Sequence, residues 1–503
     1  MAVLKIKFNK QKACESKPFS TGCSMCKLPF FCLIIPCFAF AEYPDKEFHS
    51  SPQFQFKQQN QDQQFIQQDS FLNKITINNQ EIMVGGSLEE VITALFLAIN
   101  HKQLGDIQRL LTLYQQHPEA EQGMILFAEA NIAFNQGNTK KAIQLYEQLV
   151  QQEPDFTRGK LDLAKLYFFN WQNNQSQTLF QQISLPQQPN VMNRVKQFLS
   201  QIALRQSWHG SFSLGGIYNS NLNQSGNETT KEIVDNPYLG KLELTRTRPK
   251  IQKGYGLSYE LGLSKYHALK EHNGFIFKGY FYGELYPKKS EFTEHNISLG
   301  LGYRFKDQSN QFDLYPVFEK TYAYRDWYSE RKGINLIYSK TINSDFYFSL
   351  QTEYKWEKYQ DKTLSHHNGK ILSLYPTVVY NLPNNWILFG GIDYLRKYST
   401  ESKIDQYNRK GIRFGINKYF QIGIELTAQA IFRNTNYAAY NALLGKTRRD
   451  REQKYLFTIS LPKFSFYDIT PSINLTHTIH QSNAKMLYRY KQSEIVIKLE
   501  KTF

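Results

Sequence analysis

The sequence predicts two parts, a helical repeat domain and, after it, an antiparallel outer-membrane β-barrel of about 14 strands. Hydrophobicity follows a helical period through residues 87–206 and a period of two through residues 207–503. Aromatic residues make up 15% of the chain, and membrane barrels place such residues in girdles at both interfaces. The mean hydropathy of −0.53 is too polar for a bundle of membrane-spanning helices. The predicted fold class is therefore α plus transmembrane β.

The closing strand shows the alternation clearly. Ile495, Ile497 and Leu499 lie on one face, and Lys498 and Glu500 lie on the other. A transmembrane barrel strand needs this pattern because one face meets lipid and the other meets the lumen. The pattern of a single strand also fits an amphipathic edge strand of a soluble sheet. The prediction of a barrel therefore depends on repetition of the pattern through the whole C-terminal part.

Fourteen segments carry the alternation, and each is longer than the roughly 9–11 residues that a strand needs to cross a bilayer. The segments are 207–221, 251–267, 273–287, 293–306, 311–325, 329–341, 344–360, 367–381, 385–398, 406–417, 420–436, 450–461, 467–482 and 487–503.

The gaps between these segments orient the predicted barrel. Gaps after even-numbered segments are short, whereas the two longest gaps, 222–250 and 437–449, follow odd-numbered segments. Bacterial barrels have short periplasmic turns and longer extracellular loops. We therefore expect a barrel in the outer membrane of a Gram-negative cell, with the helical domain in the periplasm.

The N-terminal region predicts export. An apolar stretch after Met25 ends at the Ala-Phe-Ala of residues 39–41, which is typical of a secretory signal and its cleavage site. We expect Met25 to be the true start and residues 1–41 to be the signal peptide region. Residues 42–86 form a glutamine-rich linker. Residues 42–70 of this linker are expected to be disordered, because they offer little apolar surface to bury.

Residues 87–206 fit stacked tetratricopeptide-like hairpins. The best unit spans residues 123–153, where Gly137 sits at the expected turn and Ala142 and Tyr146 sit at packing positions of the second helix. A generic array of helical hairpins remains open as an alternative. Either form presents a concave surface that can bind polypeptide.

Two weaker units flank this repeat. A step of 34 residues from its packing positions reaches Tyr167 and Phe180. An earlier unit covers residues 88–118, with Gly105 and Asp106 as its expected turn.

No residue pattern predicts catalysis, a cofactor or a metal site. His366 and His367 fall at the edge of a predicted extracellular loop, where a solvated role is the simpler interpretation. The C-x-x-C of Cys23 and Cys26 lacks the further ligands that a zinc site needs. The formal charge of +16 is spread over strands and loops, which disfavours nucleic acid and favours contact with anionic lipid headgroups. We therefore predict a protein that is not an enzyme.

Three stretches resemble one family. Residues 210–223 open the barrel with a signature of the aromatic-Asp-x-Asn-x-Asn type, in which Asn219 replaces the usual Asp. Residues 448–452 enter the twelfth strand, and residues 482–503 close the barrel. In this order and after helical repeats, these stretches resemble the surface lipoprotein assembly modulators (Slam), the DUF560 family of outer-membrane barrels.

The resemblance implies export without nucleotide or covalent chemistry. Members of the family deliver particular lipoproteins to the cell surface or secrete haem-scavenging proteins, so the expected partner is a client lipoprotein or a secreted protein. Outer-membrane lipid and lipopolysaccharide are further expected partners, and a contribution from periplasmic chaperones remains open. The alternative function is that of a polysaccharide export porin, which also joins tetratricopeptide repeats to a barrel.

Nine residues are candidates for client binding. The aromatic residues of the repeats would hold an incompletely folded client, unless they only pack helix on helix. The asparagines at the end of the first strand would line the lumen or form a turn. The charged residues of the twelfth strand would bind client or lipopolysaccharide, or form a solvated loop. The candidates are Tyr146, Tyr167, Phe180, Asn219, Asn221, Asn223, Arg448, Arg449 and Asp450.

Overall fold

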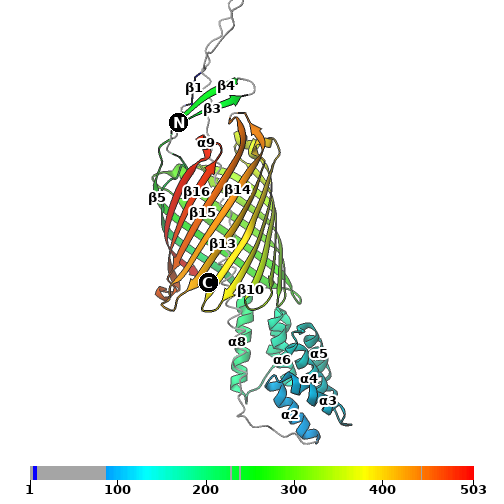
Figure 1. Cartoon of the computed structure of the whole chain (residues 1–503). Coiled ribbons are helices and arrows are strands. Elements are labelled where there is room, and N and C mark those ends of the chain that lie inside the picture. The colour runs from blue at the N-terminus through cyan, green and yellow to red at the C-terminus, as the bar shows by residue number, and fades with distance from the viewer. Residues whose placement is uncertain (1–3, 8–86, 227–228, 237–239, 248, 443) are drawn as a thin grey trace, which may run out of the picture.

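The computed structural model describes residues 4–7, 87–226, 229–236, 240–247, 249–442 and 444–503. Within these residues, a helical domain stands at one end of a closed β-barrel, and a small sheet lies beyond the other end (Figure 1). Apart from residues 4–7, the predicted signal region and linker lie outside the described residues.

The helical domain consists of three antiparallel hairpins and a longer final helix. Its helices are α2 (Leu88–Asn100), α3 (Leu104–Gln115), α4 (Gln122–Asn135), α5 (Thr139–Gln152), α6 (Thr157–Phe169), α7 (Asn173–Gln182) and α8 (Pro189–Gln206). Ser87 and Glu90 form a capping box that begins α2. A helix with the length and apolar character needed to span a membrane is not found among the described helices.

The hairpin turns recur at the spacing that the repeats predict. Lys102, Gly137 and Trp171 have φ angles of 56°, 79° and 60°, and each lies 34 or 35 residues from the next. Glycine adopts this left-handed conformation without steric cost, whereas other residues carry strain on the order of 1–3 kcal/mol there. The repeat geometry is therefore kept at two turns where the sequence offers no glycine.

The turn expected at Gly105 and Asp106 is wrong, because both residues lie in the first helical turn of α3. The chain reverses earlier, since the N–H groups of Lys102 and Gln103 donate to carbonyls of Ile99 and Ala98 at 3.1 and 3.0 Å and so end α2. A glycine beside an aspartate resembled a turn, although the reversal itself uses a lysine.

The barrel is a closed antiparallel ring of fourteen strands, as predicted, and β17 pairs with β2 to complete it. Its strands are β2 (Trp208–Asn219), β5 (Gly254–Ala268), β6 (Asn273–Leu285), β7 (Glu294–Lys306), β8 (Asn310–Ala323), β9 (Asp326–Thr341), β10 (Phe346–Tyr359), β11 (Gly369–Leu382), β12 (Trp386–Ser399), β13 (Tyr407–Tyr419), β14 (Glu425–Asn441), β15 (Lys446–Ser460), β16 (Ile469–Ser482) and β17 (Tyr490–Thr502).

The two longest predicted gaps differ from the structure. The first holds a hairpin of β3 (Thr229–Asn236) and β4 (Gly240–Thr247), with β1 (Leu4–Lys7) paired to β4. The second is not a long loop, because β14 and β15 stay paired as far as Asn441 and Lys446. Residues 437–449 lack the regular alternation of a membrane-crossing strand, since a hairpin that rises beyond the bilayer no longer needs an apolar face.

Alternate residues on the strands face opposite environments. Ile392 and Ile412 are 58% and 55% exposed on the outside of the barrel, whereas their chain neighbours Asp393 and Arg413 are 2% and 8% exposed. An exposed apolar exterior suits lipid, and an interior of charged groups suits a polar lumen. This pattern confirms the alternation that the sequence predicts.

The turn assignments give a paired stability test. Gly137→Ala should destabilise the helical domain by about 1 kcal/mol, because φ is +79° there. Gly105→Ala should stabilise it by up to about 1 kcal/mol, because Gly105 lies in a helix with open space around it. Thermal unfolding of the full chain in detergent, followed by the helical circular dichroism signal, measures both. Shifts of the same sign would contradict the assignments.

Candidate functional site

Charged side chains that face the lumen are paired along the barrel wall. On β8, Asp313 is fully buried and accepts two hydrogen bonds of 2.7 Å from Arg304 of β7. Lys278 of β6 contacts the same carboxylate at 3.2 Å. Removing one partner of a buried ion pair leaves an uncompensated charge and costs several kcal/mol. These three groups therefore depend on one another.

The same pairing continues from strand to strand. Lys355 of β10 contacts Glu319 of β8 and Glu353 of its own strand, each at 2.8 Å. Because many partners lie one or two strands apart, the ion pairs tie neighbouring strands together around the lumen. Further pairs join Glu357 to Arg331 and Lys397, Asp393 to Arg413 and Arg433, and Lys498 to Glu260.

Asn219 lies on the lumen side of the seam between the first and last strands of the barrel. Its side chain donates to Glu494 of β17 at 2.9 Å and accepts from the N–H of Asn221 at 2.8 Å. An amide at this position makes the hydrogen bonds, so no negative charge is needed to hold the seam. Client binding by Asn219 remains a prediction.

Asn221 and Asn223 hold the segment that leaves β2. The Asn221 side chain is 1% exposed and donates to the carbonyls of Ser225 and Lys491 at 2.9 and 2.8 Å. Asn223 donates to the carbonyl of Lys250 and accepts from the N–H of Gln252. Their contacts are those of the turn alternative rather than those of free lumen groups.

The charged residues of the twelfth strand are divided between two faces. Arg448 and Asp450 face inward and form an ion pair at 2.7 Å. The Arg448 guanidinium also lies 3.3 Å from the ring centre of Tyr488, in the short helix α9 (Lys485–Tyr488). Arg449 is exposed on the opposite face and binds Asn483 through its backbone N–H. The structure therefore brings together two of these three residues.

The candidate aromatic residues of the repeats lie in the helical core. Tyr146, Tyr167 and Phe180 are 2%, 8% and 1% exposed. Tyr146 accepts from the Asn131 amide at 2.9 Å, and burial raises its pKa well above the ordinary tyrosine value, so the hydroxyl stays neutral. Phe180 stacks on Phe198. Direct contact with a client would require the helices to separate, so packing is the role that this placement supports.

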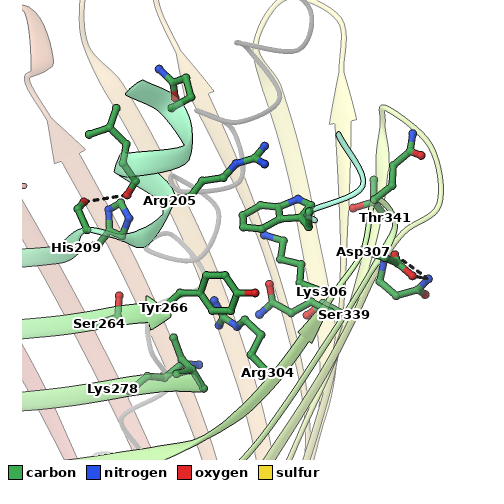
Figure 2. A pocket seen from close by; sticks show the side chains of 18 of the residues that line it. Arg205, His209, Ser264, Tyr266, Lys278, Arg304, Lys306, Asp307, Ser339 and Thr341 are labelled. Carbon is green, nitrogen blue, oxygen red and sulfur yellow. Dashed lines mark hydrogen bonds between the residues drawn. The ribbon is translucent and has the colours of Figure 1, made fainter. Parts of the chain in front are cut away.

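Sequence reasoning missed a cavity between the helical domain and the barrel mouth. It has a volume of about 300 Å³, and Figure 2 shows Arg205 of α8 across it from Tyr266, Arg304 and Lys306 of the barrel. These residues lie far apart in sequence and carry no common motif. The one sequence feature that could have pointed to this junction is Trp171, which stands where the repeat spacing places a turn and where glycine would be expected.

Cation–π contacts join the two domains at this cavity. The Trp171 ring lies 4.2 Å from the guanidinium carbon of Arg205 and 3.4 Å from the ammonium of Lys306. Arg205 is anchored by hydrogen bonds to the Phe168 carbonyl at 2.7 Å and to Asn173 at 3.2 Å. Such contacts are worth about 0.5–1 kcal/mol each at exposed sites and about 2 kcal/mol when desolvated. Trp171 is therefore held by one cation from each domain.

The extracellular end brings His366 and His367 close to Asp405. One ligand atom from each of the three residues lies within 4.8 Å of the others, and His367 Nδ1 is 3.1 Å from Asp405 Oδ1. The sequence predicted solvated histidines without a metal. The His367–Asp405 pair accounts for the geometry without a metal, and the absence of a metal remains a prediction.

A closed barrel with an apolar exterior, a charged lumen and stacked helical hairpins at one mouth defines an outer-membrane barrel with a repeat domain. Residues 208–503 match the family model described as surface lipoprotein assembly modifier. Residues 75–180 match the model for the N-terminal TPR repeats of the same family. The chain therefore belongs to the surface lipoprotein assembly modifier family, which confirms the resemblance and places it in the outer membrane.

Relatives align in sequence with this chain over most of its length. The hemophilin secretion modulator of Acinetobacter baumannii is 30% identical, and the alignment covers 86% of this chain and 89% of the relative. The surface lipoprotein assembly modifier of Pasteurella multocida Pm70 is 24% identical, covering 82% and 83%. Surface lipoprotein assembly modifier 1 of Neisseria meningitidis serogroup B is 22% identical, covering 94% and 96%.

The lumen network gives a direct test. Asp313→Asn should destabilise the barrel by about 3–5 kcal/mol, because it leaves Lys278 and Arg304 charged and buried without their carboxylate. Asp468→Asn, in an exposed turn with positive φ, is the matched control and should change stability by less than about 0.5 kcal/mol. Denaturant unfolding in detergent micelles measures both, and equal stabilities would contradict the role of the network.

Proposed function

We propose that this chain delivers a polypeptide client across the outer membrane, either a surface lipoprotein or a secreted haem-binding protein. Membership of the family supports this function, and so do the names of the relatives in Acinetobacter baumannii and Pasteurella multocida. Family members are assembly and secretion factors, and the described residues show no catalytic constellation that we recognise. We therefore propose a protein that acts by binding and guidance rather than by catalysis.

The observation that carries the proposal is direct contact between the repeats and one mouth of the barrel. The Asn174 amide donates to the carbonyl of Leu269 at 2.6 Å, and Thr139 donates to Gln308 at 2.9 Å. Leu269 and Gln308 lie in turns next to that mouth, opposite the end that holds β3 and β4 (Figure 1). Short turns mark the periplasmic side, so the repeats face the compartment from which a client arrives.

A physical route for delivery follows from this placement. Stacked hairpins bind extended or partly folded polypeptide, and the adjoining lumen wall offers charged groups in place of lost water. Folding of the client outside the cell would make its transit irreversible without nucleotide. Contact of the barrel with lipopolysaccharide and the participation of periplasmic chaperones are further parts of the proposal.

Protease shaving of intact cells tests the function. A candidate lipoprotein encoded beside this chain should become protease-accessible only in cells that express the chain, because its exposure depends on transport across the membrane. The measurement is the fraction of lipoprotein cleaved, with a periplasmic protein as the control for cell integrity. If exposure is the same without the chain for every neighbouring candidate, delivery of these clients is refuted, and polysaccharide in the medium becomes the quantity to assay.

Deletion of residues 87–206 separates delivery from passive diffusion. Client exposure should fall to the background level, because the polypeptide-binding surface is lost, whereas small-solute flux through liposomes should stay unchanged. Barrel folding is checked by its heat-modified mobility on gels. Normal client exposure without the repeats would contradict the proposed role of the helical domain.

A further inference from the structure

We propose that one half of the barrel exterior, formed by β9–β15, binds lipopolysaccharide. A belt of cations holds its phosphate groups, and an apolar groove next to the belt holds its acyl chains. The inference rests on the contact with lipopolysaccharide that the proposed function includes, and it assigns a site to that contact. Both features lie on the barrel exterior, so the site does not depend on delivery of a client.

Seven outward-facing cations lie in the extracellular halves of these strands and form the basic belt. All seven are exposed, and the residues next to them along each strand face the lumen. Arg396 is exposed, for example, whereas its neighbour Lys397 is buried in the lumen wall. The belt consists of Lys332, Lys358, Lys370, Arg396, Lys410 and Arg451, together with Arg449 two residues before Arg451.

The basic belt is confined to one side and one end of the barrel exterior. The periplasmic halves of the same seven strands carry two outward lysines, Lys340 and Lys418, and the extracellular halves of the other seven barrel strands carry Lys320 and Lys491. Among the described residues of β9–β15, Glu330 is the one carboxylate on the outer face, and it contacts Lys332 at 3.5 Å. Charges that serve only solubility need no such confinement, so the belt indicates an anionic partner at this place.

Aromatic rings between the cations place the basic belt at the membrane interface. Trp356 is 46% exposed and pairs across the sheet with Lys332 on one side and Lys370 on the other. The Arg396 guanidinium lies 4.4 Å from the ring centre of Tyr398. Because tryptophan and tyrosine concentrate where a membrane meets water, the cations lie at the height of lipid headgroups. Cations at this height can bind phosphate through charge-assisted hydrogen bonds.

An apolar groove with a volume of about 1120 Å³ lies on the outer face of β11–β17, next to the basic belt. Ile392, Phe414 and Tyr455 line it and are 58%, 54% and 40% exposed. Each stands four residues from a cation of the belt on the same strand, as Ile392 does from Arg396. Four residues of a strand span about 13 Å and return to the same face. The groove therefore begins on the periplasmic side of the cations, at the depth of the hydrocarbon.

The chemistry of the groove suits acyl chains. Gly390, Ala428 and Ala430 line it, and their small size leaves room beside the larger apolar side chains. Two polar side chains of the lining, His477 and Ser493, bind each other at 2.8 Å, so they need no polar group from a ligand. The volume is slightly above the range of about 300–1,000 Å³ that is usual for small-molecule pockets. Such a groove can hold more than one hydrocarbon chain.

Phosphates beside acyl chains at the extracellular end distinguish lipopolysaccharide from other anionic partners. An acidic segment of a client inside the lumen would not reach the belt, which faces the lipid side of the wall. Anionic phospholipids share the phosphate chemistry. The belt, however, lies toward the end that holds β3 and β4, opposite the short periplasmic turns (Figure 1), and the outer leaflet at that end consists of lipopolysaccharide.

Binding of lipid A to the full chain in detergent, measured by native mass spectrometry, tests the inference. The probe is lipid A with both phosphates, and its counterpart is the same lipid without phosphates. The phosphorylated lipid should bind at least about ten-fold more tightly. The triple variant Lys358→Gln, Lys370→Gln and Lys410→Gln should weaken its binding roughly 100-fold, because each cation near an anionic membrane surface contributes about five-fold.

Matched variants separate the site from general effects. The control triple variant Lys265→Gln, Lys340→Gln and Lys418→Gln removes three outward lysines at the periplasmic end and should change binding by less than about two-fold. Ala430→Trp should fill part of the groove and weaken the phosphorylated lipid several-fold. Thr352→Trp, which adds the same ring to the outer face of β10 outside the groove, should not. Heat-modified mobility on gels confirms folding, and if Ala430→Trp fails to fold, the belt variant decides the outcome.

Equal binding of the two lipids, or full binding by the belt variant, would overturn the inference. Equally tight binding of phosphatidylglycerol would also overturn it, because the belt would then be a general surface for anionic lipids. Unchanged binding by Ala430→Trp would remove the groove from the site. Client exposure in cells is scored separately. Delivery without binding of lipid A refutes this inference alone, and binding of lipid A without delivery refutes the proposed delivery alone.

Discussion

Closure of the sheet is the constraint on which the rest of the structure depends. A backbone N–H or carbonyl facing hydrocarbon without a partner costs several kcal/mol, so a sheet can cross a membrane only as a ring without edges. Here β17 pairs with β2 from Glu494 and Asn219 to Thr502 and Ser211, and Gly210 and Phe503 exchange two backbone hydrogen bonds of 2.7 and 3.0 Å at the periplasmic end. Helix α8 ends at Gln206, directly before this seam. The helical domain is therefore attached where the ring closes.

Closure also determines the chemistry of the lumen. Alternate residues of every strand point inward, so about half of the side chains of each strand line the lumen. Because these charged side chains are shielded from water, each needs an oppositely charged partner. The wall meets this demand with shared partners, as Asp393 shows by binding both Arg413 and Arg433. Under the proposed function, a charged client segment inside the lumen would meet groups that already have partners, so its passage would proceed by exchange of ion pairs. Such exchange would keep binding weak enough for the client to move on.

The sequence predicted those features that obey local rules. Period-two alternation identified the lipid face of Ile497 and the strand count, and the 34-residue step located Gly137 and the aromatic core around Tyr146. The sequence-based prediction failed where a local residue pattern pointed to one structure and the surrounding fold imposed another. A glycine in α3 resembled a turn. The ends of β14 and β15 resembled a loop, because they extend beyond the bilayer and lack the alternation of a membrane-crossing strand. The cavity could not be predicted, since Trp171, Tyr266 and Lys306 come together only through the fold and no spacing links them.

The junction shows how a repeat domain and a barrel can act as one unit. Each could fold by its own rules, the repeats by stacking and the barrel by closure, yet they share charged and aromatic groups at their boundary. Lys306 belongs to the end of β7 and lies against Trp171 of the repeats, while Arg205 of α8 lies against the same ring. A third repeat with glycine at its turn would reverse the chain with less strain but would leave both cations without this ring. The strained tryptophan is therefore best explained by what it does between the domains, because the turn alone does not require it.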